Sequence, residues 1–250
     1  MEPKDIFKKR NFSKVNFEYE ELIGRNLSNT NLSGVDLKNR DVHNANLSGA
    51  DLTGADLSDT ILFNVKLRGA DLQNVNLSNA KLWDTDLYGV DLTNANVSGA
   101  DLFYADLRNS EIKNTNLSGV DLKNRDVHNA NLSGADLTGA DLSDTILFNV
   151  KLRGADLQNV NLSNAKLWDT DLYGVDLTNA NLSGADLFYA DLRNSEIKNT
   201  NLSGVNLRHT NFEGATFTSI NFRNANYDLD TIDTISKDIK LILEMQGKLW

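Results

Sequence analysis

A five-residue period governs most of the chain and limits the folds that are open to it. Steps of five from Phe12 to Tyr227 give 44 positions, and each of them is Leu, Phe, Val, Ile or Tyr, with Leu at 33. No insertion breaks this phase. A period of five fits neither an α-helix, which repeats every 3.6 residues, nor a flat strand, which repeats every two. We therefore expect the chain to turn after every five residues.

The other positions of the period predict how each turn is built. Two residues before the large apolar residue stands a small one, as at Ala50 and Ala55, and Asp or Asn usually lies between them. Two residues after it Gly or Asn is common, and 15 of the 16 glycines fall there. Gly and Asn tolerate the backbone that a sharp corner needs. We expect the large and small residues to point inward and the Asp or Asn to point outward. The leucines expected in the core include Leu52, Leu72, Leu92, Leu137 and Leu157.

Such turns have to stack into a solenoid, because one turn cannot bury a core by itself. At the β-strand spacing of about 4.8 Å, each coil satisfies the backbone groups of its neighbours. The sequence resembles the pentapeptide repeat family, whose motif A(D/N)LXX reads ADLTG at residues 50–54. The resemblance covers residues 10–229 and implies an all-β fold, a right-handed quadrilateral β-helix with four pentapeptides per coil and about 11 coils.

Both ends of the chain leave the period. We expect residues 1–9 to cap the N-terminal end of the solenoid. In residues 230–250 apolar side chains recur at helical spacing, which predicts an amphipathic C-terminal helix. This helix would cap the solenoid or join two copies of the chain. The resemblance adds weight to a homodimer, because the gyrase-binding members of the family are dimers joined through their C-terminal ends.

Residues 29–113 and 114–198 are two copies of one sequence, which differ only in that Val97 corresponds to Leu182. A recent tandem duplication and deliberate engineering both produce such near-identity, and the sequence leaves both open. The offset of 85 residues is 17 pentapeptides, or four and a quarter coils. We therefore expect a surface column of the first copy to reappear one face further round in the second.

The net charge of the chain comes from the two copies, each of which has 12 acidic and 7 basic residues. The chain has 35 acidic and 25 basic residues and a net charge of −10, which argues against a general nucleic-acid binder. Acidic residues spaced by one coil predict a carboxylate column in each copy, although solubility alone would explain the charge. These columns are Asp51, Asp71, Asp91 and Glu111 in the first copy and Asp136, Asp156, Asp176 and Glu196 in the second.

Aromatic residues at outward positions form the second surface feature. Exposed aromatic clusters mark partner sites, but they also stabilise a surface by stacking on one another, and the sequence leaves both interpretations open. The predicted aromatic columns are Phe63, Trp83 and Phe103 in the first copy and Phe148, Trp168 and Phe188 in the second. Arg40 and Arg125 occupy the small inward position, and we expect both guanidinium groups to turn outward because an unpaired buried charge is costly.

The sequence predicts no chemistry of its own. It has no Cys, and none of its three His forms a pair at metal-ligand spacing. No nucleophile relay or phosphate-binding glycine loop is apparent, so we expect no catalytic residues, no cofactor and no enzyme. No apolar run approaches the roughly 18 residues that a membrane span needs. The N-terminus lacks the apolar segment of a signal peptide, which makes a cytoplasmic location the expectation.

Two functions remain. The first is a structural scaffold, a rigid acidic rod that presents surfaces to a protein partner, which the sequence does not identify. The second is implied by the resemblance, because quinolone-resistance members of the family are acidic quadrilateral rods that bind DNA gyrase. On that interpretation the chain is a DNA-mimicking inhibitor or protector of a type II topoisomerase, in which Asp51, Asp71 and Asp91 replace phosphates.

Overall fold

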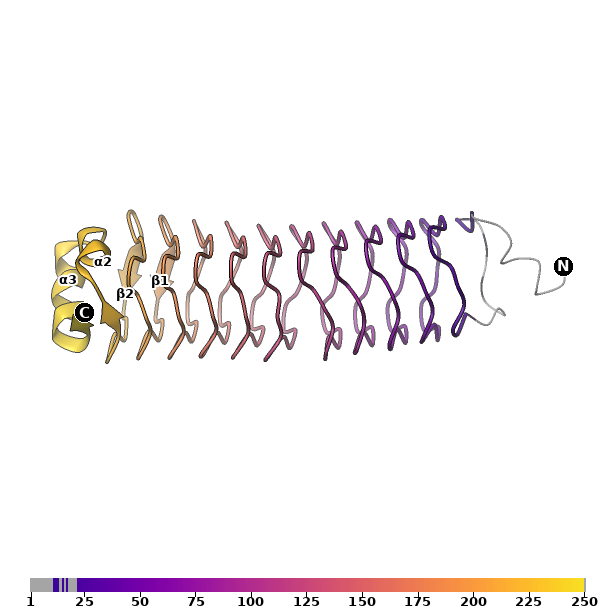
Figure 1. The fold of residues 1–250 in the computed structure, drawn as a ribbon. Helices are drawn as coiled ribbons and strands as arrows, with labels where there is room; N and C mark the ends of the chain where they lie inside the picture. The colour runs from indigo at the N-terminus through magenta and orange to yellow at the C-terminus, as the bar shows by residue number, and fades with distance from the viewer. Residues whose placement is uncertain (1–10, 14, 16, 18–21, 250) are drawn as a thin grey trace. The chain divides into compact units, whose positions relative to one another are not determined.

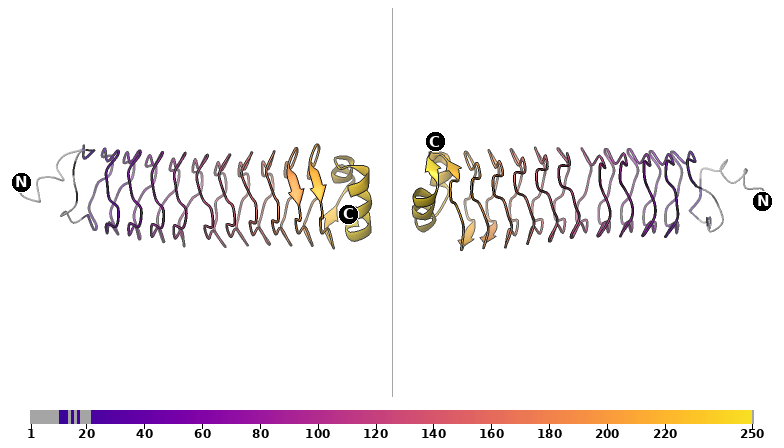
Figure 2. Two further views of the ribbon diagram at one scale, coloured as in Figure 1. Left: turned by 180° about the vertical axis from the view of Figure 1, so that it is seen from behind. Right: turned by 90° about the horizontal axis from the view of Figure 1, so that it is seen from below.

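The chain forms two compact units, residues 1–120 and residues 121–250, which we call the first and the second unit. In each unit successive coils of backbone are stacked, and helices follow the last coil of the second unit (Figures 1 and 2). The computed structural model describes residues 11–13, 15, 17 and 22–249. The N-terminal cap expected over residues 1–9 lies outside these described residues. Within them, neither helix is long and apolar enough to cross a membrane.

Parallel β-bridges join residues that are 20 positions apart. In the first unit Asp51 pairs with Asp71, and in the second unit Asp136 pairs with Asp156. One coil therefore contains four pentapeptides. The N–H of Leu52 donates to the carbonyl of Asp71 in the next coil at 2.8 Å, and the N–H of Asp71 donates back to the carbonyl of Ala50 at 3.0 Å. Each coil thus satisfies the backbone of its neighbours, as the spacing of parallel strands requires.

The corners explain the Gly and Asn residues of the period. Gly54 has φ +66° and Asn74 has φ +58°, and this left-handed backbone recurs two residues after the large apolar residue. Larger side chains also adopt it, including Tyr104 at φ +59°, Tyr189 at φ +59° and His209 at φ +57°. These three corners are less favourable for the backbone, because a Cβ atom disfavours the left-handed region.

Large and small apolar side chains together fill the interior of the coils. The small residues Ala50 and Ala55 are each 1% exposed. Arg40 and Arg125, which occupy the same small position, are half-buried, and Nε of Arg125 donates to the carbonyl of Lys123 at 3.0 Å. The leucines that the period places in the core, Leu52, Leu72, Leu92, Leu137 and Leu157, are all buried.

Regular strands are short because a corner interrupts the chain in every pentapeptide. In the second unit β1 (Glu196–Lys198) pairs in parallel with β2 (Thr216–Thr218). Similarly β3 (Asn226–Tyr227) pairs in parallel with β4 (Lys248–Leu249) near the end of the chain. The β1–β2 pair keeps the 20-residue register of the bridges, whereas the β3–β4 pair joins residues 22 positions apart.

The C-terminal segment contains two helices where the sequence predicts one over residues 230–250. Helix α2 spans Leu229–Asp233 and α3 spans Lys237–Gln246. Asp228 caps α2 by accepting a hydrogen bond from the N–H of Thr231 at 2.9 Å. The chain leaves α2 at Thr234 and begins α3 after Ser236. A break at residues 234–236 therefore divides the expected helix.

Side chains of this segment replace the carbonyls that a further coil would supply. The N–H of Phe212 donates to Oγ1 of Thr234 at 3.1 Å. The N–H of Phe222 donates to Oε1 of Gln246 at 3.0 Å. Within the stack the corresponding N–H groups donate to backbone carbonyls. The helices consequently cover the exposed edge of the last coil, which would otherwise offer unpaired backbone groups to another chain.

Candidate functional site

The first aromatic column consists of Phe63, Trp83 and Phe103 at one corner of successive coils in the first unit. The backbone sets this register, because the N–H of Asn64 donates to the carbonyl of Trp83 and the N–H of Asp84 to that of Phe103. The rings of Phe63 and Trp83 stack with centroids 4.0 Å apart and planes at 26°. Trp83 is 40% exposed and Phe103 is 51% exposed. The column therefore packs on itself and still presents apolar surface.

The second aromatic column consists of Phe148, Trp168 and Phe188 in the second unit. The rings of Phe148 and Trp168 lie 5.7 Å apart between centroids and are tilted by 59°. Phe148 is 39% and Trp168 is 43% exposed. Phe188 is half-buried, and its ring makes edge contacts with Tyr189 and His209. The rings of this column therefore contact neighbouring rings and also keep exposed surface.

Exposed aliphatic residues extend the apolar surface beside each column. Ile61 precedes Phe63 by two residues and is 42% exposed, and its counterpart Ile146 precedes Phe148 and is 43% exposed. At both positions Ile replaces the Asp or Asn that usually stands before the core residue. The replacement removes a polar side chain and leaves an apolar one beside the rings.

The carboxylate columns also stack as the sequence predicts. Parallel bridges connect Asp51 to Asp71, Asp71 to Asp91 and Asp91 to Glu111 in the first unit. The same chain of bridges runs from Asp136 through Asp156 and Asp176 to Glu196 in the second unit. All eight are half-buried except Glu196, which is exposed.

These carboxylates have a structural task that the sequence analysis missed. Oδ1 of Asp51 accepts the N–H of Thr53 at 3.0 Å, and Oδ1 of Asp71 accepts the N–H of Gln73 at 3.1 Å. Such contacts stabilise the turn, because they join the residue before the core leucine to the residue after it. The preference for Asp or Asn at this position is the signal that could have found them, since both residues carry the same acceptor oxygen. The contact recurs at Asp91, Asp136, Asp156 and Asp176.

One ion pair in each copy changes a carboxyl pKa. Arg108 donates to Asp106 through Nε at 2.7 Å and through Nη2 at 2.6 Å. These hydrogen bonds hold the pKa of Asp106 below its ordinary value, although burial opposes the shift. Arg193 lowers the pKa of Asp191 in the same way in the second copy.

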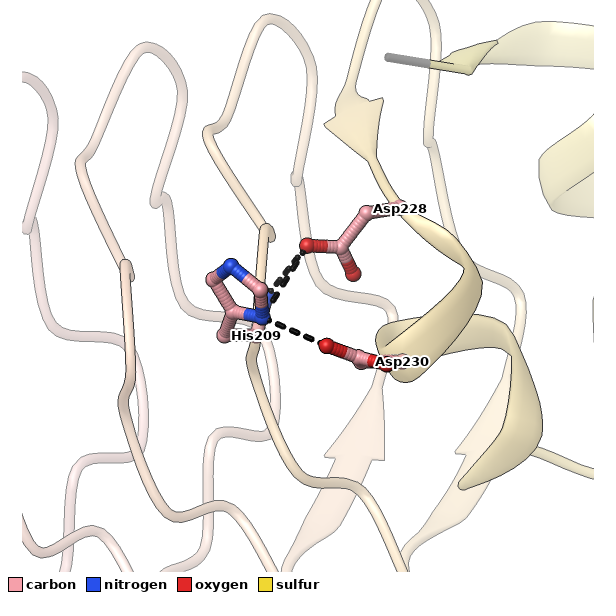
Figure 3. A group of neighbouring side chains, drawn as sticks. All are labelled: His209, Asp228 and Asp230. Atoms are coloured by element: carbon pink, nitrogen blue, oxygen red, sulfur yellow. Dashed lines mark hydrogen bonds and ion pairs between the residues drawn. The ribbon is translucent and has the colours of Figure 1, made fainter.

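A group of one imidazole and two carboxylates lies where the last coil meets α2 (Figure 3). Nδ1 of His209 is 2.7 Å from Oδ2 of Asp230 and 3.3 Å from Oδ2 of Asp228. One ligand atom from each residue lies within 4.8 Å of the others. Among the described residues, this is the group of three or more such side chains whose geometry fits a metal ion.

Neighbouring groups hold the members of this cluster in place. Oδ2 of Asp228 accepts the N–H of His209 at 3.0 Å, and its Oδ1 accepts the N–H and hydroxyl of Thr231 at 2.9 and 2.8 Å. Burial raises the pKa of Asp228, but these hydrogen bonds outweigh it, so the pKa lies below its ordinary value. The ring of Tyr189 stacks on the imidazole with centroids 4.6 Å apart and planes at 11°.

From the sequence, His209 has no partner at metal-ligand spacing, and no metal site is predicted. The coil period contains the missing signal. A step of 20 from His209 reaches Leu229, and Asp228 and Asp230 stand on either side of it. Because the five-residue period ends at Tyr227, the prediction does not extend the step into the C-terminal segment and misses this juxtaposition.

The chain belongs to the pentapeptide repeat family. The family model "Pentapeptide repeats (8 copies)" matches it over seven ranges, some of which overlap. The matched residues are 30–69, 43–79, 70–109, 115–154, 128–164, 155–194 and 185–226. No curated protein sequence is significantly similar to the chain.

Solved structures of other pentapeptide repeat proteins resemble parts of the chain. HetL, involved in heterocyst differentiation regulation in the cyanobacterium Nostoc sp. strain PCC 7120, is 29% identical over 82% of this chain and 86% of its own, with a TM-score of 0.32. Rfr23 from the cyanobacterium Cyanothece 51142 is 31% identical over 45% of this chain and 90% of its own, with a TM-score of 0.27. QnrB1, a plasmid-mediated fluoroquinolone resistance protein, is 17% identical over 76% of this chain and 91% of its own, with a TM-score of 0.33.

Proposed function

We propose that the chain is a non-enzymatic scaffold that binds a protein partner through its aromatic columns. The exposed tryptophan at the centre of each column carries this proposal. Trp83 is 40% and Trp168 is 43% exposed although each contacts a neighbouring ring. Trp is among the residues that dominate binding energy when a partner covers them.

The duplication gives this proposal a second support. Each copy contains the same column, so the chain offers two sites of one chemistry. A partner with two matching sites, or two linked partners, would bind more tightly than either site allows alone. The carboxylate oxygens, by contrast, accept hydrogen bonds from their own turns, whereas the aromatic rings contact other rings and keep exposed surface.

Differential capture tests the scaffold function. The full chain is immobilised and exposed to an extract of the source cells, in parallel with a Trp83→Ala/Trp168→Ala variant and an Asp71→Asn/Asp156→Asn variant. We expect a partner that the wild type and the Asn variant retain and the Ala variant loses. Equal retention by all three proteins would place binding elsewhere and contradict the proposal.

Mimicry of DNA toward a type II topoisomerase such as DNA gyrase is the second candidate function. The ordered carboxylate columns favour it, because their members pair coil by coil in each unit. One oxygen of each aspartate remains outside the turn contact, which leaves some charge for a protein groove that binds phosphates. Titration of the purified chain into a gyrase supercoiling reaction distinguishes this candidate from the scaffold.

Dimerisation through the C-terminal helices is a further part of the proposal. Leu243 of α3 is 1% exposed and faces inward, whereas Leu241 and Met245 are 59% and 78% exposed. A second copy would cover these apolar side chains. Sedimentation velocity of the wild type and of a Met245→Glu variant tests this contact, and a monomeric wild type would exclude it. The cytoplasmic location stays a prediction from the sequence.

A further inference from the structure

We propose that His209, Asp228 and Asp230 bind one divalent transition-metal ion of the Zn²⁺ class. The ion would connect the last coil to helix α2. The proposal does not rest on the scaffold function, although the imidazole of His209 contacts the ring of Phe188 at the end of the second aromatic column.

The distances within the cluster suit a shared ion. Zinc binds imidazole nitrogen and carboxylate oxygen at about 2.0–2.2 Å in tetrahedral geometry, so two ligand atoms of one ion lie roughly 3.3–3.6 Å apart. Nδ1 of His209 is 3.3 Å from Oδ2 of Asp228 and 2.7 Å from Oδ2 of Asp230. The contact with Asp228 matches this separation, and the Asp230 side chain, which solvent surrounds, has room to turn and lengthen its shorter contact.

The ligands are oriented before an ion arrives. Tyr189 stacks on the imidazole of His209, and Thr231 holds the carboxylate of Asp228 through two hydrogen bonds. Partners of this kind orient the ligands of metal sites and raise their affinity. The side chain of Asp230 is 73% exposed. The solvent side of the cluster therefore remains open to water molecules that complete the coordination.

The mixture of ligands selects the class of metal. Imidazole nitrogen favours Zn²⁺, Co²⁺ and similar ions, whereas Mg²⁺ and Ca²⁺ prefer ligand sets made of oxygen alone. The two carboxylates balance the charge of the ion. Nδ1 has to release its proton to become a ligand, so binding is expected to weaken as the pH falls.

The other two histidines provide matched controls. Nδ1 of His43 is 2.7 Å from Oδ1 of Asp41, and Nδ1 of His128 is 2.7 Å from Oδ1 of Asp126. Each of these pairs involves residues two positions apart at one corner. His209 alone among the three is grouped with carboxylates of the C-terminal segment within the described residues.

Calorimetric titration of the full chain with ZnCl₂ tests the site directly. We expect one ion per chain with micromolar affinity and no comparable binding of MgCl₂. His209→Asn should weaken zinc binding at least tenfold. Asn keeps the left-handed corner, as Asn194 shows at φ +57°, so this variant retains the fold. The control variant His43→Asn/His128→Asn should bind zinc like the wild type.

Thermal unfolding distinguishes loss of the zinc site from a loss of folding stability. Zinc should raise the melting temperature of the wild type and of the control variant but not that of His209→Asn. Asp230→Asn, at an exposed position, should lower zinc affinity without changing the melting temperature of the metal-free protein. Absence of zinc binding up to millimolar concentration, or equal binding by wild type and His209→Asn, would overturn the proposal.

Discussion

The carboxylate columns and the aromatic columns have the same spacing but different relations to the fold. In the carboxylate columns, Oδ1 of Asp71 accepts the N–H of Gln73 and so helps to close a turn. In the aromatic columns, the rings of Phe63 and Trp83 contact each other and keep exposed surface. A coil period stacks any side chain into a column. The contacts of each column, and not its regularity, indicate which surface is available to a partner.

The largest effect is expected from the core that supports both columns. Leu157→Ala in the second unit, or its counterpart Leu72→Ala in the first, removes a fully buried side chain. Each substitution should lower the free energy of unfolding by about 2–5 kcal/mol, because it leaves a cavity. Chemical denaturation followed by circular dichroism measures the loss. A change below about 1 kcal/mol would mean that the coil interior is loosely packed.

A smaller effect is expected in the aromatic columns. Trp83→Ala removes the stack on Phe63 and part of the buried ring surface. We expect a loss of about 1–2 kcal/mol in the free energy of unfolding, with partner capture weakened in this variant and abolished in Trp83→Ala/Trp168→Ala. The counterpart Trp168→Ala serves as a replicate in the second unit. Retained capture by the double variant would show that the rings only stabilise the coil surface.

Substitutions in the carboxylate columns should separate the effect of hydrogen bonding on stability from the effect of charge. Asp71→Ala removes the acceptor for the N–H of Gln73 and should cost about 1 kcal/mol. Asp71→Asn keeps the acceptor oxygen and should leave the stability nearly unchanged, as natural Asn residues at equivalent positions suggest. Asn76, for example, accepts the N–H of Ser78 through Oδ1 at 3.2 Å. Thermal unfolding of both variants distinguishes these outcomes. An equal loss of stability in the two variants would contradict the structural role of the hydrogen bond.

The smallest effect concerns the dependence of stability on pH. The Arg108 guanidinium lowers the pKa of Asp106 in the folded state, so the contact stabilises the fold fully above the unfolded value of 3.8. This stabilisation is lost as the pH falls through the lower folded pKa. Arg108→Gln should reduce stability by less than about 1 kcal/mol at pH 7 and flatten the dependence below about pH 4. Denaturation midpoints of the wild type and of Arg108→Gln between pH 2 and pH 7 measure this dependence (roughly the range over which carboxylates titrate).

The sequence predicts the coils well because one rule applies to every residue in them. Each step of five places a leucine inward, and Leu52 and Leu137 are buried where the period puts them. The same step places Trp83 and Trp168 on the surface. Asn and Gly at the corners also follow, since the corner backbone has positive φ.

The end of the solenoid could not be predicted by the same rule, because the period stops there. The hydrogen bond from Phe222 to the side chain of Gln246 joins residues 24 apart and follows no repeat. The break between α2 and α3 depends on contacts with the last coil. A step of one coil from His209 leads to the residues of its cluster, but the contacts within the cluster depend on where α2 begins. Prediction therefore fails where tertiary contacts replace a repeated local pattern.

Gyrase supercoiling in the presence of the purified chain tests the central claim most directly. The claim is that the carboxylate columns serve the turns of the fold and that the aromatic columns bind partners. It predicts that supercoiling continues unchanged at moderate salt, even with a large molar excess of the wild type. Inhibition by the wild type that disappears when the aspartates of both carboxylate columns are replaced by Asn would contradict the claim and establish DNA mimicry.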